Sequence, residues 1–86
     1  MDKKKKFQLI PGVGENISRD FVDLGYTEPV DLQSEDPEQM YRDLIKLRGR
    51  HVDRCVLYVF RCAVYFATTP APDRELLQWW KWKDEK

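Results

Sequence analysis

One long apolar stretch, from Val52 to Ala67, limits the folds open to this sequence more than any other feature. It carries the charged residues Asp53, Arg54 and Arg61, and it is shorter than the roughly 20 apolar residues of a membrane-spanning helix. Its apolar residues recur at helical spacing. We therefore expect a central helix over residues 50–68, buried in a soluble protein. The expected inward residues are Val52, Cys55, Val56, Val59, Cys62, Ala63 and Phe66.

Glycine and proline divide the rest of the chain into shorter segments, none of which alternates with the period of a strand. With 86 residues, the chain has room for one core. We predict an all-α fold, with a single domain over residues 1–86. The other expected helices cover residues 3–10, 14–24, 36–48 and 73–82, with a short helical turn beginning at Pro29.

The ends of these helices carry recognisable signals. Asp36, with Pro37 at the first helical position and Gln39 at the third, has the pattern of a capping box. Gly25 and Gly49 follow helices as C-terminal glycines do. The residues expected to face inward from the second and third long helices are Ile17, Phe21, Leu24, Met40, Leu44 and Leu47.

The segment from Leu9 to Gly14, Leu-Ile-Pro-Gly-Val-Gly, joins the first two expected helices. Glycines in such a turn leave backbone amides unshielded, and the following helix begins with its positive dipole end there. Amides and dipole together suit a phosphate oxygen. The candidate phosphate contacts are therefore Pro11, Gly12, Val13 and Gly14, with Lys3, Lys4, Lys5 and Lys6 adding positive charge beside them.

This turn resembles the helix-hairpin-helix motif, in which an apolar residue, Pro, Gly, an apolar residue and Gly precede a helix that often begins with a basic residue. Here Glu15 and Asn16 occupy those places instead, and Asp20 and Asp23 follow. Carboxylates beside a phosphate path repel it. A hairpin that only connects helices, or that contacts protein, remains an equal alternative.

Charge is segregated along the chain although 15 basic and 15 acidic residues cancel. The net charge is +3 over residues 1–14, −7 over residues 15–45, +4 over residues 46–62 and zero beyond. Either the basic segments neutralise the acidic one inside the protein, or they leave a basic edge for phosphate.

A basic and aromatic stripe is expected on the outer face of the central helix. Its members are Arg50, Arg54, Tyr58, Arg61 and Tyr65. Arginine binds phosphate and tyrosine stacks on bases, so Arg54 and Arg61 join the candidate nucleic-acid contacts. The alternative, which we favour, pairs Arg54 or Arg61 with Asp20, Asp23 or Asp43 inside the protein.

His51, Cys55 and Cys62 lie near one face of the central helix, which raises the question of metal or thiol chemistry. Zinc sites normally need four ligands, and the chain has no CxxC pair or second histidine. The two cysteines are too far apart along a helix to form a disulfide. We expect free thiols packed as small core residues, and neither a metal nor another cofactor.

The C-terminal tryptophans Trp79, Trp80 and Trp82 are interleaved with Lys81 and Lys83. They could stack on bases, but large aromatic side chains close the core of a small domain more often. We favour the core role, with any exposed remainder as a dimer contact.

Longer stretches resemble the bacterial family called Cdd1, or pathogenicity locus. They are HVDRCVLYVFRCAVYFA from His51 to Ala67, EDPEQMYRDL before it and LLQWWKWKD after it, so the resemblance covers nearly the whole chain. It implies a helix-hairpin-helix-like fold, and some members bear the name mitomycin resistance protein. The family offers no agreed catalytic residues to carry over.

These observations favour a small protein that binds DNA phosphates without sequence preference. The alternative is a protein-interaction adaptor that uses the acidic surface or the Trp-rich end. An enzyme is not expected, because no acid–base or nucleophile constellation stands out. The basic N-terminus is not followed by an apolar signal region, so the expected location is the cytoplasm, with no membrane contact.

Overall fold

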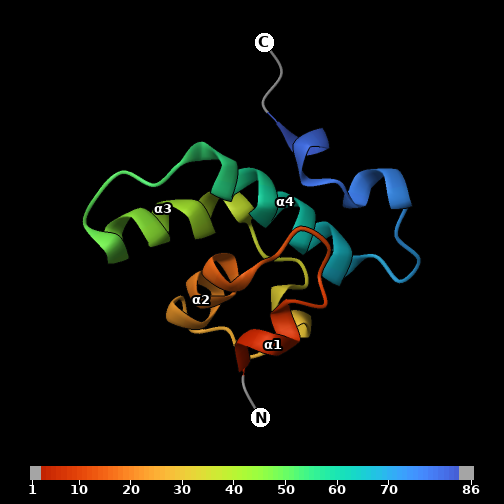
Figure 1. The fold of residues 1–86 in the computed structure, drawn as a ribbon, viewed down its shortest axis with the longest axis horizontal. Coiled ribbons are helices and arrows are strands. Elements are labelled where there is room, and N and C mark those ends of the chain that lie inside the picture. The colour runs from red at the N-terminus through yellow and green to blue at the C-terminus, as the bar shows by residue number, and fades with distance from the viewer. Residues whose placement is uncertain (1–2, 84–86) are drawn as a thin grey trace.

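The computed structural model describes residues 3–83, and their fold is all-α, as the sequence predicts (Figure 1). The α-helices are α1 (Lys3–Phe7), α2 (Glu15–Asp23), α3 (Pro37–Arg48) and α4 (Arg54–Thr68). The 3-10 helix η1 (Pro29–Leu32) lies between α2 and α3, and two more, η2 (Arg74–Leu77) and η3 (Trp79–Trp82), follow α4.

Helix α4 is the central element, with α3, η1, η2 and η3 packed against it, while α1 packs on α2. It begins at Arg54, four residues later than predicted, because the Asp53 carboxylate accepts a hydrogen bond from the amide of Cys55 at 2.9 Å and caps the helix there. None of the helices described is long and apolar enough to cross a membrane.

The inward face of α4 differs in part from the predicted stripe. Val59, Cys62 and Ala63 are buried as expected, but Cys55 is exposed, so its predicted core role is wrong. Cys55 lies in the first turn of the helix. Leu57 and Phe60 are fully buried instead, since α4 is covered on more than one side.

Three phenylalanines join α1, α2 and α4. The rings of Phe7 and Phe21 lie 5.0 Å apart, those of Phe21 and Phe60 lie 5.1 Å apart, and none of the three is accessible to solvent. Burial of one such side chain stabilises a fold by about 1.5–3 kcal/mol. This stack fixes how the two N-terminal helices sit on α4.

Helix α1 ends at Phe7, three residues before the predicted end. After Phe7 the chain tightens, with the amide of Ile10 donating to the carbonyl of Phe7 at 3.0 Å. This turn buries Ile10 and Val13, which a continued helix would carry away from the core.

Helix α3 follows the predicted boundaries, but its capping box does not form. Asp36 accepts from the amide of Glu38 at 3.0 Å, whereas the side chain of Gln39 donates to Asp43 at 2.8 Å and so does not return to the N-terminus. Leu47 is 52% exposed, contrary to prediction, and Tyr41 is buried, with its hydroxyl bonded to the carbonyl of Val52.

The predicted C-terminal helix over residues 73–82 is wrong. Asp73 caps the segment as expected, accepting from the amide of Glu75 at 2.9 Å, but two 3-10 helices replace the α-helix. The carbonyl of Leu76 accepts the indole N–H of Trp82 at 2.7 Å. The extended backbone of Gln78, between the two 3-10 helices, bends the chain so that this indole can reach back.

Candidate nucleic-acid interface

The turn between α1 and α2 has the backbone geometry that its glycines permit. Gly12 lies at φ 85°, in the left-handed region. Val13 is buried, and its amide donates to the carbonyl of Ile10 at 3.1 Å. That amide is therefore engaged inside the turn, and the main contribution of Val13 is to anchor the turn in the core beside the half-buried Pro11.

The C-terminal segment covers part of this turn. A Cβ atom added at Gly12 would lie 3.3 Å from Cδ1 of Trp79, so the indole packs directly on the glycine. Trp79 is half-buried against the core, which confirms its predicted core role, while Trp80 remains 49% exposed. Gly12 thus serves a packing contact as well as a turn.

Gly14, by contrast, is open to solvent. It is the N-cap of α2, with φ −97° and ψ −167°, and a Cβ atom there would meet nothing within 4 Å. No side chain among residues 3–83 caps the first turn of α2, whose amides have no partners within the helix. The carbonyl of Gly14 accepts both the amide and the buried hydroxyl of Ser18, at 3.0 and 2.6 Å, which fixes this end of the helix.

The carboxylates of α2 each have a cation nearby. Arg48 at the end of α3 binds Asp20 at 2.6 Å and Asp23 at 2.8 Å. The hydrogen bond to Asp20, followed by the one to Asp23, raises the pKa of Arg48 above its ordinary value. Glu15 lies 4.0 Å from Arg19. The repulsion expected beside the turn is therefore partly compensated within the protein.

The predicted partners of these carboxylates were wrong, although internal pairing occurs. Arg61 binds Glu38 of α3 and the carbonyl of Trp82, and the guanidinium of Arg54 lies 5.8 Å from the ring centroid of Tyr41. Arg48 reaches Asp20 and Asp23 instead, because the C-terminal end of α3 lies beside α2.

A hollow of about 580 Å³ begins at Asn16 in the first turn of α2 and extends to the connection between α3 and α4. Its walls bring three arginines together with two aspartates: Arg19, Arg48, Arg50, Asp20 and Asp53. Arg19 and Arg48 were not among the predicted contacts at this site. Only Arg48 belongs to a basic segment, whereas Arg19 lies in the segment of net charge −7, and no local pattern predicts that the two meet.

The lysines predicted to assist the turn lie on α1. Lys5 is exposed, and Lys6 is 3.9 Å from Glu28. The side chains of Lys3 and Lys4 lie outside the described part of the structure. The structure thus brings Lys5 and Lys6 to the same helical hairpin as Gly12 and Gly14, whereas Arg54 and Arg61 belong to α4.

Cys62 does not lie on the surface with His51 and Cys55. His51 and Cys55 are exposed, whereas Cys62 is buried and its thiol donates to the carbonyl of Leu76 at 3.6 Å. Burial raises the pKa of Cys62 to about 11, and a hydrogen bond with Asp53 raises that of Cys55. Both thiols are free, as predicted, and residues 3–83 contain no group of three metal-ligating side chains that could share an ion.

These features define a small all-α protein with a glycine turn at the edge of its core. A comparison with family models is more specific: residues 1–86 match Cdd1, described as pathogenicity locus, and the chain belongs to that family. No curated protein matches the chain, and no solved structure does.

Proposed function

We propose that this protein binds the phosphate backbone of nucleic acid, DNA in the first place, without sequence preference. The observation that carries the proposal is the exposed, uncapped N-terminus of α2 at Gly14, which opens beside a hollow lined by three arginines. Helix N-termini and arginines both favour phosphate oxygens.

In this proposal one phosphate lies at the first turn of α2. Its oxygens accept from the amides there, and Gly14 leaves room for the close approach. Gly12 shapes the turn that leads to this point. Lys5 and Lys6 on α1, together with Lys3 and Lys4, supply positive charge beside it.

Neighbouring phosphates of the strand follow the hollow, where Arg19 and Arg50 supply guanidinium groups. Arg48 assists indirectly, because its pairing with Asp20 and Asp23 reduces their repulsion of the strand. A protein with zero net charge has no strong long-range attraction to DNA, so this binding is weak and falls steeply with salt. We also propose that the protein is located in the cytoplasm.

The replacement Gly14→Ser tests this mechanism. The backbone of Gly14 suits a serine N-cap, whose hydroxyl would bond to the first-turn amides and occupy the phosphate position. We expect the affinity for a labelled DNA duplex to fall about tenfold, measured by fluorescence anisotropy at low salt, while thermal stability stays equal or rises. Unchanged affinity in a folded Gly14→Ser protein would refute the proposal.

The arginines of the hollow are tested separately. Arg50→Gln should weaken duplex binding and reduce the slope of log affinity against log salt by about one. Lys46→Gln, which removes a charge from an exposed position of α3 that does not line the hollow, is the matched control and should have a smaller effect.

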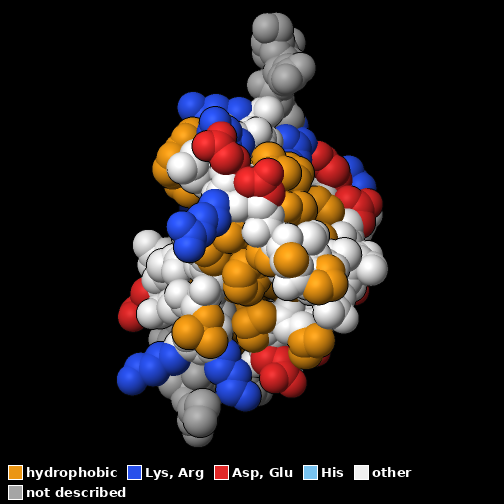
Figure 2. Space-filling view, turned by 90° about the vertical axis from the view of Figure 1, so that its right-hand side faces the viewer, with side chains coloured by type: hydrophobic (Ala, Val, Ile, Leu, Met, Phe, Trp, Pro, Cys, Tyr) orange, Lys and Arg blue, Asp and Glu red, His pale blue; other side chains and the backbone are white. Residues whose placement is uncertain are grey.

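Protein interaction is the second candidate function, and the surface in Figure 2 favours it. Hydrophobic side chains gather over the middle of that face, on the side of the molecule where α1 and η2 lie. Leu9 is 75% exposed, and Leu76 and Trp80 are exposed as well. A binding partner that is retained by Gly14→Ser and lost by Leu9→Ser with Trp80→Ser would assign the role to these exposed apolar side chains. DNA binding would then be unaffected by the double replacement.

A further inference from the structure

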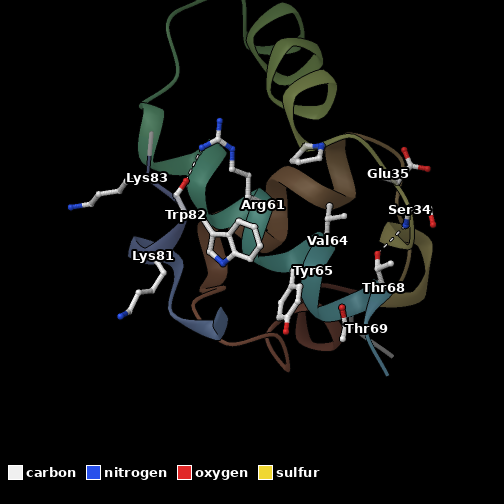
Figure 3. Close-up of a pocket in the computed structure, with 11 residues that line it drawn as sticks. Ser34, Glu35, Arg61, Val64, Tyr65, Thr68, Thr69, Lys81, Trp82 and Lys83 are labelled. Atoms are coloured by element: carbon white, nitrogen blue, oxygen red, sulfur yellow. Dashed lines mark hydrogen bonds between the residues drawn. The ribbon is translucent and has the colours of Figure 1, made fainter. Parts of the chain in front are cut away.

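A second hollow, of about 630 Å³, lies between α4, the segment before α3 and η3 (Figure 3). We propose that it binds one unpaired nucleotide of a single strand, with the base in the hollow and its phosphate at Lys81 and Lys83. The proposal goes beyond backbone binding at α2, and it does not depend on that site.

The floor of this hollow is aromatic and apolar. The rings of Tyr65 and Trp82 lie 5.5 Å apart at an interplanar angle of 44°, with Val64 beside them. Both aromatic side chains are only half-buried, so ring surface remains available to a flat ligand. Bases stack on such side chains whatever their sequence, because every base has an aromatic face.

Trp82 is fixed in position by its own hydrogen bonds. Its indole N–H donates to the carbonyl of Leu76 at 2.7 Å, and its carbonyl accepts from the guanidinium of Arg61 at 2.7 Å. Arg61 is in turn bound to Glu38. A ring that is already ordered loses little conformational freedom when a base stacks on it.

The two sides of the hollow differ in chemistry. Lys81 and Lys83 lie on one side, whereas Ser34 and Glu35 lie across the floor from them (Figure 3). Lys81 is 3.5 Å from Glu75, in an exposed pair that a phosphate can replace. A nucleotide has the same division, with an anionic phosphate at one end and the polar edge of a base at the other.

The side of the hollow that carries Glu35 predicts which bases bind best. Oε1 of Glu35 accepts from the hydroxyl of Tyr26 at 3.2 Å, which orients the carboxylate. A carboxylate accepts hydrogen bonds and donates none, so it favours the amino groups of adenine, cytosine and guanine over the N3–H of thymine, which lies between two carbonyl oxygens that repel the carboxylate. Adenine, cytosine and guanine therefore bind better than thymine.

An unusual backbone conformation at the edge of the hollow supports the assignment of a ligand site there. Ser34 has φ 60°, and it is the one non-glycine residue with positive φ among residues 3–83. Its amide donates to the hydroxyl of Thr68 at 3.0 Å, which fixes Ser34 against α4. Such conformations are disfavoured for L-residues, and they cluster at ligand sites.

An acidic peptide is the competing occupant. Its carboxylates would also meet Lys81 and Lys83, but the rest of the chain would then lie against the carboxylate of Glu35. The base edge of a nucleotide satisfies that carboxylate by hydrogen bonds, so the two-sided charge pattern favours the nucleotide.

The experiment uses the full chain carrying Gly14→Ser, so that binding at α2 is already weakened. Short single-stranded oligonucleotides, (dA)6 and (dT)6, are titrated while tryptophan fluorescence is followed. We expect quenching by both, with tighter binding of (dA)6, and about tenfold weaker binding when Lys81→Gln and Lys83→Gln are added. The controls Lys46→Gln and Trp80→Phe should bind as the parent does.

Replacing Glu35 by Gln should reduce the preference for (dA)6 over (dT)6 without abolishing binding. The proposal is overturned if the lysine replacements leave the affinity unchanged, or if a short acidic peptide binds the hollow more tightly than (dA)6. Loss of duplex binding by Gly14→Ser with intact (dA)6 binding separates this site from the one at α2.

Discussion

The helical core and the C-terminal segment are built on different principles. The side chains of Phe7, Phe21 and Phe60 are shielded from solvent completely, and they join three helices, α1, α2 and α4. In residues 73–83, η2 and η3 contain no buried residue. That segment is attached by the half-buried Trp79, which packs against the core, and by individual hydrogen bonds to α4, including those of Arg61 and Tyr65.

The difference separates stability from site formation. Apolar burial stabilises the core as a unit, whereas directional bonds allow the C-terminal segment to open by itself at lower cost. Yet that segment touches both candidate sites, through Trp79 at the turn and Trp82 in the second hollow.

The largest expected effect comes from Phe21→Ala, which removes the middle ring of the core stack. The free energy of unfolding should fall by about 3–5 kcal/mol, because a cavity replaces a fully buried ring. Denaturant unfolding measures the loss. Leu9→Ala, at a position 75% exposed, is the control and should cost far less.

Gly12→Ala tests the junction between the two regions. We expect the free energy of unfolding to fall by about 1–2 kcal/mol because of the left-handed backbone alone. Displacement of Trp79 should lower it further. Gly25→Ala is the matched comparison, since Gly25 also has positive φ but its added Cβ would meet nothing within 4 Å. Equal losses of unfolding free energy in the two variants would show that the contact of Trp79 with Gly12 does not restrict the residue at position 12.

Arg61→Gln should loosen the C-terminal segment while the core persists. Loss of the bonds to Glu38 and to the carbonyl of Trp82 should favour local opening by about 1 kcal/mol, or about fivefold. Labelling of Cys62 reports this opening, because its buried thiol is bonded to Leu76. The parent should label quickly at Cys55 only, and Cys62 should label faster in Arg61→Gln.

If Cys62 labelling in Arg61→Gln follows global unfolding instead, the two regions form one cooperative unit. Measuring unfolding by circular dichroism on the same samples distinguishes these results, since local opening leaves the helical signal nearly unchanged.

The smallest expected effect is on the stability of the protein at low pH. Hydrogen bonds from Cys55 lower the pKa of Asp53 from 3.8, so its contribution to stability is present above that value and is lost as the pH falls through the lowered pKa. Stability measured between pH 5 and about 2 should therefore decline, and less steeply in Asp53→Asn. An identical decline in that variant would contradict this role.

The sequence predicts the core better than the C-terminal segment, for a physical reason. Helical spacing and the glycines at positions 25 and 49 mark where α2 and α3 end, because those signals act locally. The break at Gln78 depends on a carbonyl accepting from an indole six residues away, which no local pattern encodes.

The candidate sites can likewise be predicted from the sequence only where they depend on local patterns. The turn at Gly12 and Gly14 is visible in the sequence because its glycines are only two positions apart in the chain. The partnership of Arg48 with Asp20 spans 28 residues, so it follows from the tertiary fold rather than from charge spacing along the chain. Net charge predicted internal pairing, but only the fold selects the partners.

The two tryptophans at the ends of η3 connect the two candidate sites. Trp79 packs on Gly12, Trp82 packs on Tyr65, and both side chains extend from the same single helical turn. A ligand that shifts the backbone of this turn at one site therefore shifts it at the other. By thermodynamic reciprocity, any coupling by which filling the second hollow changes the affinity at the α2 turn acts equally in the opposite direction.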